Sequence, residues 1–489
     1  MAVERVTTGV RGLDDILGGG FPRNHIYLVE GDPGVGKTTL ALKFLLEGAA
    51  QGERSVYITL SETAAEINEI AGAHGWSLDN IELFELSALE QRLQLNSENT
   101  VFHPSEVELT ETTRAVLDFV GKVDPHRVVF DSLSELRLLA QSQLRYRREV
   151  LNLKQYFSTK RSTVILLDDR TSDPQDMQLQ SLAHGVVSLQ QLPPDYGGDR
   201  RRLRIVKMRG IPYQTGFHDF DIETGGLRVY RRLVASEHHK PFERTQISSG
   251  LAPLDAMLGG GLDRGTSTLL LGPAGTGKSA CVAQYVTAAA KRDQRSVIFA
   301  FDELRTTAIA RADALGMGMS KYVANGSITI QQVDPAEMSP GELGDRIQTL
   351  VRDEGVKIVV IDSLNGYLAS MPAERYLYIQ LHELLAYLGQ LGVTTMLTMA
   401  QAGLVGEVQA PIEVSYVADT VVLLRYFEAF GRVRKAISVV KKRSGRHEDT
   451  IRELTLSTDG VVVGAPLHQF SGVLTSAPSY HGVRDDLTT

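Results

Sequence analysis

The stretch Gly31-Asp32-Pro33-Gly34-Val35-Gly36-Lys37-Thr38 decides the fold of this chain, and it occurs twice. The second copy is Gly272-Pro273-Ala274-Gly275-Thr276-Gly277-Lys278-Ser279. Both fit G-x-x-x-x-G-K-[ST], the pattern of the phosphate-binding P-loop. Its glycines let backbone N–H groups face phosphate oxygens, its lysine brings a positive charge to the β- and γ-phosphates, and its hydroxyl binds Mg²⁺. The two loops therefore predict two sites for ATP and Mg²⁺.

An apolar strand precedes each loop and a helix follows it. Residues 25–30 and 267–271 are β-prone runs, and helical patterns begin at Thr39 and Ala280. A P-loop must run into a helix, whose positive N-terminal end faces the nucleotide. We therefore add Thr39 and Ala280 to the expected nucleotide contacts. A degenerate loop in one half is the alternative, although both copies keep the lysine and the hydroxyl.

Shorter matches hold the same offset of 241 residues as the loops. Thr8-Gly9 corresponds to Ser249-Gly250, and Gly18-Gly19-Gly20 corresponds to Gly259-Gly260-Gly261. This pattern indicates a duplicated domain and not a short solenoid repeat. The polar segment 236–241 ends in proline, as a linker does. We predict an N-terminal domain at residues 1–235 and a C-terminal domain at residues 236–489.

Composition is that of an ordinary globular protein. The chain has 489 residues, 43% of them hydrophobic and 22% charged, so each half can bury a full core. A net charge of −8 argues against a protein that coats nucleic acid. The single cysteine, Cys281, excludes an intrachain disulfide. The N-terminus lacks a signal-peptide core and no stretch is apolar enough to span a membrane, so we expect a cytoplasmic protein.

Strands and helices alternate in each half. The first half has expected strands and helices at 55–60, 64–73, 127–131, 136–157 and 163–168. The second half repeats this pattern at 296–301, 358–362, 376–389 and 393–399. Shorter β segments follow at 185–190, 203–208, 226–230, 420–426, 436–441 and 451–456. We predict two tandem α/β P-loop domains, each a mostly parallel sheet flanked by helices with a late antiparallel β extension.

Asp131 and Asp362 are the expected magnesium carboxylates. Each ends an apolar strand and is followed by Ser-Leu. An ATPase needs such a carboxylate on the strand beside the P-loop, and it acts with the loop hydroxyl, here Thr38 or Ser279. The alternative role is to cap the next helix. The upstream P-loops favour the metal role.

Glu62, Asp302 and Glu303 are the candidate catalytic carboxylates. They follow the second strand of each half, where the carboxyl ends of parallel strands face the nucleotide crevice. A base or a water-positioning group is needed at this place for hydrolysis. The residues themselves support an N-cap role for the following helix equally well.

Two basic pairs end late strands in corresponding positions: Lys207 with Arg209, and Lys441 with Arg443. In a monomer these would be solvated charges. In a ring they would reach a neighbour's γ-phosphate and neutralise its developing charge. The residues alone favour neither reading.

Together these residues resemble the KaiC family, which belongs to the RecA/DnaB-like ATPases. The tandem P-loops, triple glycines, Asp-Ser-Leu and Lys-x-Arg carry the resemblance, which spans residues 6–478. It implies RecA-like domains in a double-ring homohexamer, with ATP at each subunit interface and slow hydrolysis in the N-terminal tier. In clock members it implies autophosphorylation in the C-terminal tier, with KaiA and KaiB as partners. It also implies that the two Lys-x-Arg pairs contact a neighbour's nucleotide.

The chain departs from clock members at several positions. Adjacent glutamates of the family correspond to Ser61-Glu62 and Asp302-Glu303, and a Ser-Thr phosphorylation pair corresponds to Ser415-Tyr416. We therefore expect no ordered two-site phosphorylation cycle, and leave open whether Ser415 alone is phosphorylated. Segments 101–108 and 466–475 also differ, which indicates a non-clock bacterial branch. KaiA is not an expected partner, whereas a KaiB-like protein or a signalling kinase is left open.

The leading hypothesis is an ATP-hydrolysing hexameric switch for signalling or timing. Whether the C-terminal domain also has Ser/Thr autokinase activity is left open. The first alternative, a DNA-handling ATPase, draws on the arginines at 145–148 and 200–204. Acidic neighbours surround them and no aromatic stacking platform accompanies them, so nucleic acid is not an expected partner. The second alternative, an ATP-bound scaffold without turnover, conflicts with the retained carboxylates at 62, 302 and 303.

Overall fold

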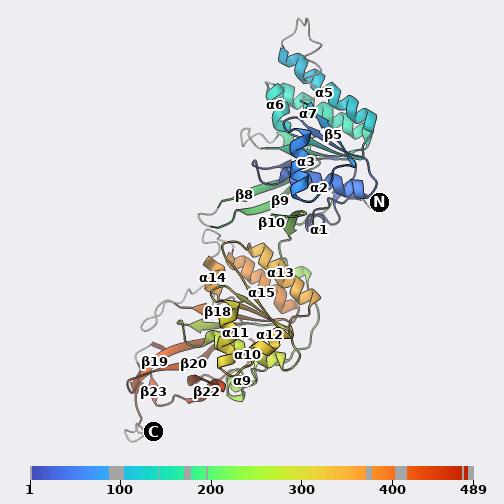
Figure 1. Ribbon diagram of the computed structural model, residues 1–489. Coiled ribbons are helices and arrows are strands. Elements are labelled where there is room, and N and C mark those ends of the chain that lie inside the picture. Colours follow the sequence, from blue (N-terminus) through green and yellow to red (C-terminus); the bar gives the residue numbers. More distant parts are fainter. Residues whose placement is uncertain are drawn as a thin grey trace. The chain divides into compact units, whose positions relative to one another are not determined.

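The chain folds into two compact units, residues 1–232 and 233–489, and each has its own sheet and helices (Figure 1). The computed structural model describes residues 3–86, 104–140, 142–169, 178–193, 197–369, 377–401, 416–475 and 478–482.

The N-terminal unit is built on a nine-stranded sheet in the order β11-β10-β9-β8-β3-β7-β6-β4-β5. Its strands are β3 (Ile26–Glu30), β4 (Ser55–Thr59), β5 (Ile81–Glu85), β6 (Arg127–Asp131), β7 (Thr163–Asp168), β8 (Gly185–Leu192), β9 (Arg200–Met208), β10 (His218–Glu223) and β11 (Gly226–Tyr230). The segment from β8 to β5 is parallel, and β9, β10 and β11 extend it with antiparallel pairs. The helices are α1 (Leu13–Ile16), α2 (Lys37–Ala50), α3 (Ala64–Ala73), α5 (Pro104–Val123), α6 (Leu133–Ala140), α7 (Gln143–Lys160) and α8 (Gln178–Leu182).

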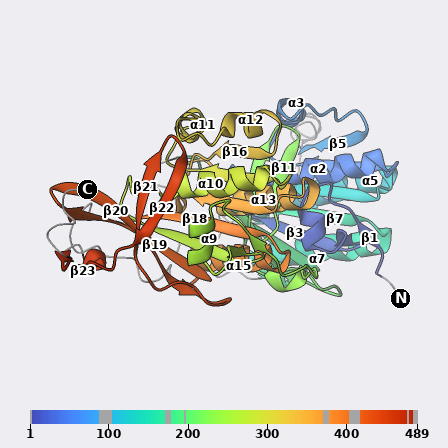
Figure 2. The same ribbon diagram turned by 90° about the horizontal axis from the view of Figure 1, so that it is seen from below.

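The C-terminal unit repeats this architecture in the order β16-β15-β17-β18-β14-β19-β20-β21-β22. Its strands are β14 (Ser267–Gly272), β15 (Ser296–Ala300), β16 (Ile328–Gln332), β17 (Ile358–Asp362), β18 (Thr394–Ala400), β19 (Thr420–Ala429), β20 (Arg432–Lys442), β21 (Arg452–Ser457) and β22 (Gly460–Pro466). The helices are α9 (Ala252–Met257), α10 (Lys278–Ala290), α11 (Arg305–Ala314), α12 (Met319–Ala324), α13 (Pro340–Asp353), α14 (Leu364–Ala369) and α15 (Leu377–Gln390). In Figure 2 the strands β19 to β22 form the red ribbon beside the C-terminus.

Short β pairs sit beside both sheets. Strand β1 (Arg5–Val6) pairs with β2 (Phe21–Pro22), and β12 (Gln246–Ile247) pairs with β13 (Leu262–Asp263). Near the C-terminus, β23 (Phe470–Ser471) pairs with β24 (Ser479–Tyr480). Aromatic contacts hold this last pair against the β19–β20 hairpin, with ring centroids 5.6 Å apart for Phe427 and Phe470 and 5.0 Å apart for Phe430 and Tyr480.

Alternate residues of the central strands face opposite sides of the N-terminal sheet. In β3, Tyr27 and Val29 join the apolar cluster that contains α2, whereas Ile26 and Leu28 join the cluster that contains α5, α6 and α7. Because side chains alternate along a strand, one continuous apolar run buries both faces. The result is a sheet between two helical layers.

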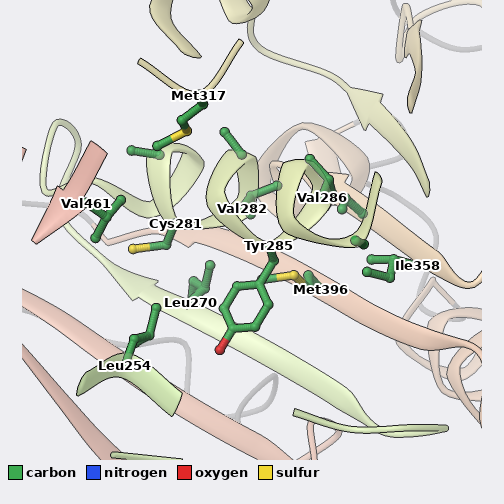
Figure 3. Packing of buried hydrophobic residues seen from close by; sticks show 14 of the residues in the cluster. Leu254, Leu270, Cys281, Val282, Tyr285, Val286, Met317, Ile358, Met396 and Val461 are labelled. Carbon is green, nitrogen blue, oxygen red and sulfur yellow. The ribbon is translucent and has the colours of Figure 1, made fainter. Parts of the chain in front are cut away.

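The second sheet is packed in the same way. Leu270 on β14 lies in a cluster with α10, and Figure 3 shows it beside Cys281 and Tyr285 of that helix. Its neighbours Leu269 and Leu271 belong to the cluster on the other face, with α13 and α15. Burial raises the pKa of the Cys281 thiol to about 12, so this cysteine is a small apolar core residue.

The predicted fold class is confirmed, and two expectations about it were wrong. The single helix expected over 136–157 is two helices, since α6 ends at Ala140 and Ser142 caps α7 by accepting a hydrogen bond from the Arg145 amide at 3.3 Å. The strand that ends in Asp131 is not beside the P-loop strand, because β7 lies between β3 and β6. Likewise β18 separates β14 from the strand that ends in Asp362.

Candidate functional site

Both P-loops have the backbone that their glycines were expected to allow. Gly34 and Gly36 have φ of 78° and 105°, and Gly275 and Gly277 have φ of 77° and 110°. These left-handed values are costly for residues with a Cβ. The loops run directly into α2 and α10, whose N-terminal N–H groups are thereby presented at the carboxyl edge of each sheet.

The two P-loop lysines differ in their partners. Lys37 donates hydrogen bonds to the carbonyl oxygens of Gly31 and Asp32, at 2.8 and 2.9 Å, and its Nζ also lies 2.7 Å from the Asp169 carboxylate. Among the described residues, Lys278 donates only to the carbonyl oxygens of Gly272 and Pro273, both at 2.8 Å. Burial lowers the pKa of Lys278, and the charge of Asp362 opposes that shift. In the N-terminal site a phosphate must therefore compete with a carboxylate for the lysine.

Asp131 is buried at the end of β6 and faces the P-loop hydroxyl. Tyr57 on β4 donates a hydrogen bond to its carboxylate at 2.5 Å, and Thr38 donates another. Burial raises the pKa of Asp131 and the charge of Asp169 raises it further, whereas the two hydrogen bonds and Lys37 oppose the rise. A buried carboxylate beside a hydroxyl, with more negative than positive charge around it, is a donor set that suits Mg²⁺.

The C-terminal site holds its carboxylate differently. Asp362 accepts a hydrogen bond from Thr398 on β18 and lies close enough to Lys278 to affect its pKa. The peptide bond after it is cis, as is the bond after Asp131. Ser279 is the second residue of α10, directly after Lys278. Thr38 with Asp131 and Ser279 with Asp362 are the residues that would hold Mg²⁺; when bound, the ion supplies positive charge next to the phosphates.

Glu62 presents an unpartnered carboxylate oxygen to the N-terminal site. Its Oε2 atom is buried and accepts no hydrogen bond from any residue that the structure describes. Burial raises the pKa of Glu62, and the charges of Asp131, Glu66 and Asp169 raise it further, with Lys37 opposing. A carboxylate with an elevated pKa and a free oxygen, beside the P-loop lysine, is suited to accept a proton from water.

The two corresponding carboxylates of the C-terminal unit both accept hydrogen bonds from side chains. Glu303 accepts hydrogen bonds from Nη1 of Arg311 at 2.7 and 2.6 Å, one to each carboxylate oxygen. Asp302 accepts a hydrogen bond from Ser363, the residue after Asp362. The position that corresponds to Arg311 in the N-terminal unit is Ile70, which has no charge. The two sites thus have similar P-loops, but the candidate base is paired with an arginine only in the C-terminal unit.

The basic pairs lie back along the sheets from the P-loops, level with the middle or the amino half of the strands that precede those loops. Lys207 donates to the Gln180 carbonyl oxygen and Arg209 donates to that of Ser181 at 3.2 Å. Through β8, Lys207 is level with Leu28, three residues before Gly31 on the parallel strand β3, about 10 Å along the strand. Burial lowers the pKa of Lys207, and the charges of Arg209 and Lys154 lower it further.

The pair on β20 is placed in the same way. Lys441 donates to the Ala418 carbonyl oxygen at 2.8 Å, and Arg443 donates to that of Tyr416 at 2.6 Å and lies 3.5 Å from the Asp419 carboxylate. Through β19, Lys441 is level with Leu269, at the amino half of β14. Burial lowers the pKa of Lys441. These hydrogen bonds of the two pairs all go to residues outside the P-loops.

Four residues near the loops escaped sequence reasoning: Asp169, Tyr57, Arg311 and Gln401. Asp169 directly follows a strand, so the rule used for Glu62 would have found it. The same rule would have found Gln401, which directly follows β18. Gln401 is buried, and its amide oxygen accepts no hydrogen bond from the residues that the structure describes. Tyr57 and Arg311 have no such signal, because they look like ordinary strand and helix residues. Ser415 lies outside the described residues.

The described part of the chain lacks two kinds of feature. It holds no group of three or more His, Cys, Asp or Glu side chains arranged to bind a metal ion. Among its helices, none combines the length and the apolar character that a membrane crossing requires.

Fold and sites together define a class: the chain consists of two tandem RecA-like P-loop NTPase domains. The family model described as KaiC, an ATPase, matches residues 6–234 and again residues 247–468. The chain belongs to the KaiC family.

Curated relatives match over nearly the whole chain. The circadian clock protein KaiC3 of Synechocystis sp. is 24% identical over 485 residues, which are 98% of this chain and 95% of that protein. The circadian clock oscillator protein KaiC of Synechococcus elongatus is 25% identical over 487 residues, 98% of this chain and 92% of that protein. The KaiC of Prochlorococcus marinus strain SARG is 26% identical, with coverage of 98% and 96%.

Proposed function

We propose that this protein binds and hydrolyses ATP at two sites per chain, that neighbouring copies complete these sites in a double-ring hexamer, and that the assembly acts as an ATP-driven switch. The arrangement around the N-terminal P-loop carries the proposal, because Lys37, Asp131 and Glu62 combine a phosphate-binding cation, a metal-binding carboxylate and a free base. The KaiC family supports the ATPase activity in general.

The chain's own residues suggest a sequence of roles. The loop N–H groups and Lys37 bind the phosphates, and Lys37 exchanges the Asp169 carboxylate for them. Glu62 then accepts a proton from the attacking water at its free Oε2. Lys207 is level with the middle of β3, about 10 Å along the strand from Gly31, and its hydrogen bond goes to Gln180, so we infer that this pair serves the nucleotide of another subunit. That placement supports a ring in which each interface completes one site.

The switch role and autokinase activity are the finer parts of the proposal. Relatives that are named circadian clock proteins support a signalling or timing role. Ser415 is the proposed phosphorylation site, in a chain that has Tyr416 beside it. A KaiB-like protein or a signalling kinase would read the nucleotide state.

One experiment tests the proposal as a whole. Purified protein is incubated with Mg-ATP or Mg-ADP, and phosphate release, particle size and intact mass are measured on the same samples. We expect phosphate release, a hexamer with Mg-ATP, and a rate per chain that falls on dilution as rings dissociate. Full turnover by a monomer would contradict the shared sites. The absence of both turnover and nucleotide binding would contradict the ATPase proposal, and an unchanged mass would remove the autokinase.

Arg311 is expected to restrain the C-terminal site. In a background that carries Glu62→Gln, the substitution Arg311→Ala should raise phosphate release by about two- to fivefold, because a partly exposed ion pair of this kind contributes up to about 1 kcal/mol. Steady-state phosphate release measures the effect. Arg305→Ala is the matched control, since Arg305 is exposed on the same helix. A decrease in turnover after Arg311→Ala would instead show that the ion pair holds Glu303 in its working position.

A further inference from the structure

A cavity of about 280 Å³ lies at the amino ends of the parallel strands in the C-terminal unit. Its lining includes residues just before β14, β15, β17 and β18, so it opens at the edge of the sheet opposite the P-loop. Three cationic side chains line it: Arg264, Arg295 and Lys357. Two acidic residues, Asp293 and Glu354, lie on the same lining.

The cations of the cavity have no carboxylate partner. Arg264 donates from Nε to the Gly392 carbonyl oxygen at 2.9 Å and lies over the Phe242 ring, with 5.5 Å from Cζ to the ring centroid. Arg295 donates to the backbone carbonyl of Glu354 at 3.3 Å. Within the described residues, neither arginine nor Lys357 has a carboxylate oxygen within 4.0 Å. The arginines are thus held in place by backbone and ring contacts while their charge is left without a partner.

In the N-terminal unit, the arginines at the corresponding positions are paired with carboxylates. There Arg23 lies 2.9 Å from Glu4 and 2.7 Å from Glu53, and Arg54 lies 3.0 Å from Asp124. Each arginine therefore has a carboxylate partner from its own chain. Although burial alone would raise the pKa of Glu53, hydrogen bonds from the arginines around it lower that pKa.

The C-terminal unit keeps these two arginines and lacks all three carboxylates. Position relative to the strands gives the correspondence: Arg264 for Arg23, Arg295 for Arg54, Thr245 for Glu4, Gln294 for Glu53, and Gly355 for Asp124. All five of these C-terminal residues line the cavity. In the part of the chain that the structure describes, the buried amide oxygen Oε1 of Gln294 has no hydrogen-bond partner. Gln294 has the size of Glu53 without its charge, whereas Thr245 and Gly355 are smaller than Glu4 and Asp124. The cavity therefore corresponds to the space that the Glu4 and Asp124 side chains take up in the other unit.

We propose that this cavity binds a small oxyanion, a phosphate or carboxylate group that supplies the negative charge which Glu4 and Asp124 supply in the N-terminal unit. The volume lies just below the roughly 300–1,000 Å³ of typical small-molecule sites, which fits a small ligand. Asp293 and Glu354 on the lining disfavour a highly charged ligand, so a single oxyanion group fits better than a polyphosphate. The site is separate from the proposed ATPase sites, and its occupancy would stabilise the C-terminal unit.

The test titrates inorganic phosphate or succinate into the full chain saturated with Mg-ADP, so that the P-loops are already filled. The Tm of the wild type should rise by about 3–6 °C when the probe is present at roughly ten times its Kd. Gln294→Glu restores the internal carboxylate and should remove this rise. Arg295→Gln removes one cation at an exposed position and should also remove it. The matched control is Arg54→Gln, at the corresponding position of the N-terminal unit, which should leave the rise intact.

The outcomes separate the alternatives. A response to phosphate alone or to succinate alone identifies the class of oxyanion, and a response to both leaves the shared chemistry. If neither probe shifts the Tm of the wild type, the proposal is overturned. It is also overturned if Gln294→Glu and Arg295→Gln respond as fully as the wild type, because the anion then binds elsewhere. Since nucleotide hydrolysis is not measured, these results are independent of the proposed ATPase.

Discussion

Replacing Glu62 with glutamine is expected to lower phosphate release at the N-terminal site by about 10²–10⁴-fold, the usual contribution of a positioned general base. Glutamine keeps the size of the side chain but cannot accept the proton. The measurement is single-turnover and steady-state phosphate release in a Lys278→Ala background, which silences the C-terminal site. Nucleotide affinity should change little, because the P-loop itself is intact.

Glu69→Gln is the matched control, since Glu69 is an exposed carboxylate on α3, the helix that follows Glu62 in the chain. It should leave the rate unchanged. The pH profile adds a second readout. Because burial raises the pKa of Glu62 above its ordinary value of 4.5, the acidic limb of kcat/KM should lie above pH 4.5, and the variant should lose that limb. A wild-type rate that is already negligible, and unchanged in the variant, would favour the scaffold alternative.

Replacing Arg127 with isoleucine should destabilise the N-terminal unit by about 3–5 kcal/mol, the usual cost of removing one partner of a buried ion pair. Arg127 is completely buried, and its Nε lies 2.5 Å from Glu53. It also donates hydrogen bonds to the carbonyl oxygens of Thr7 and Phe44, at 2.7 and 2.8 Å. Denaturant unfolding followed by circular dichroism, with each unit's transition fitted separately, measures the loss.

The C-terminal unit supplies the control for this experiment. It has Ile358 where the N-terminal unit has Arg127, and Gln294 where it has Glu53. The double variant Glu53→Gln, Arg127→Ile should therefore be more stable than Arg127→Ile alone. In the single variant the Glu53 carboxylate loses Arg127 and keeps only Arg23 as an ion-pair partner, whereas the double variant has no carboxylate at this position. If the two variants are equally unstable, the loss comes from packing against α2 and not from the stranded charge.

The loss of stability caused by Arg127→Ile is also expected to depend on pH. Since the folded-state pKa of Glu53 is lowered, its ion pairs add stability above the pKa of Glu53 in the unfolded chain, and this stability is lost as the pH falls through the folded pKa. The destabilisation by Arg127→Ile should accordingly be smaller at acidic pH than at neutral pH, because Glu53 is then protonated in both proteins. The same unfolding series at two pH values measures this difference.

Local patterns predicted the central part of the fold. The P-loops set the position of β3 and β14, and continuous apolar runs located β4, β6, β7 and their counterparts. Elements with weaker patterns were missed, among them β5, α5, β16 and α13. The order of the strands in the sheet could not be predicted from the sequence. In the chain, β6, which ends in Asp131, comes before β7. In the sheet, β7 lies between β6 and the P-loop strand β3.

The candidate site was predictable where one rule applied, that polar groups at the carboxyl ends of parallel strands meet at one edge. That rule located Glu62 and Asp131. It could not show that Lys37 pairs with Asp169, more than 100 residues away, or that Arg311 occupies Glu303 while Ile70 leaves Glu62 free. Such differences depend on which side chains the tertiary fold brings within hydrogen-bond distance.

The strand register that separates Lys207 from its own Gly31 has a consequence for inheritance. In the proposed ring, catalytic ability belongs to pairs of adjoining chains and not to any one of them. A chain with a damaged basic pair would keep its own nucleotide yet impose the defect on the next chain. Mutant alleles of this kind would be dominant over the wild type, whereas two chains damaged at opposite edges would complement each other in part.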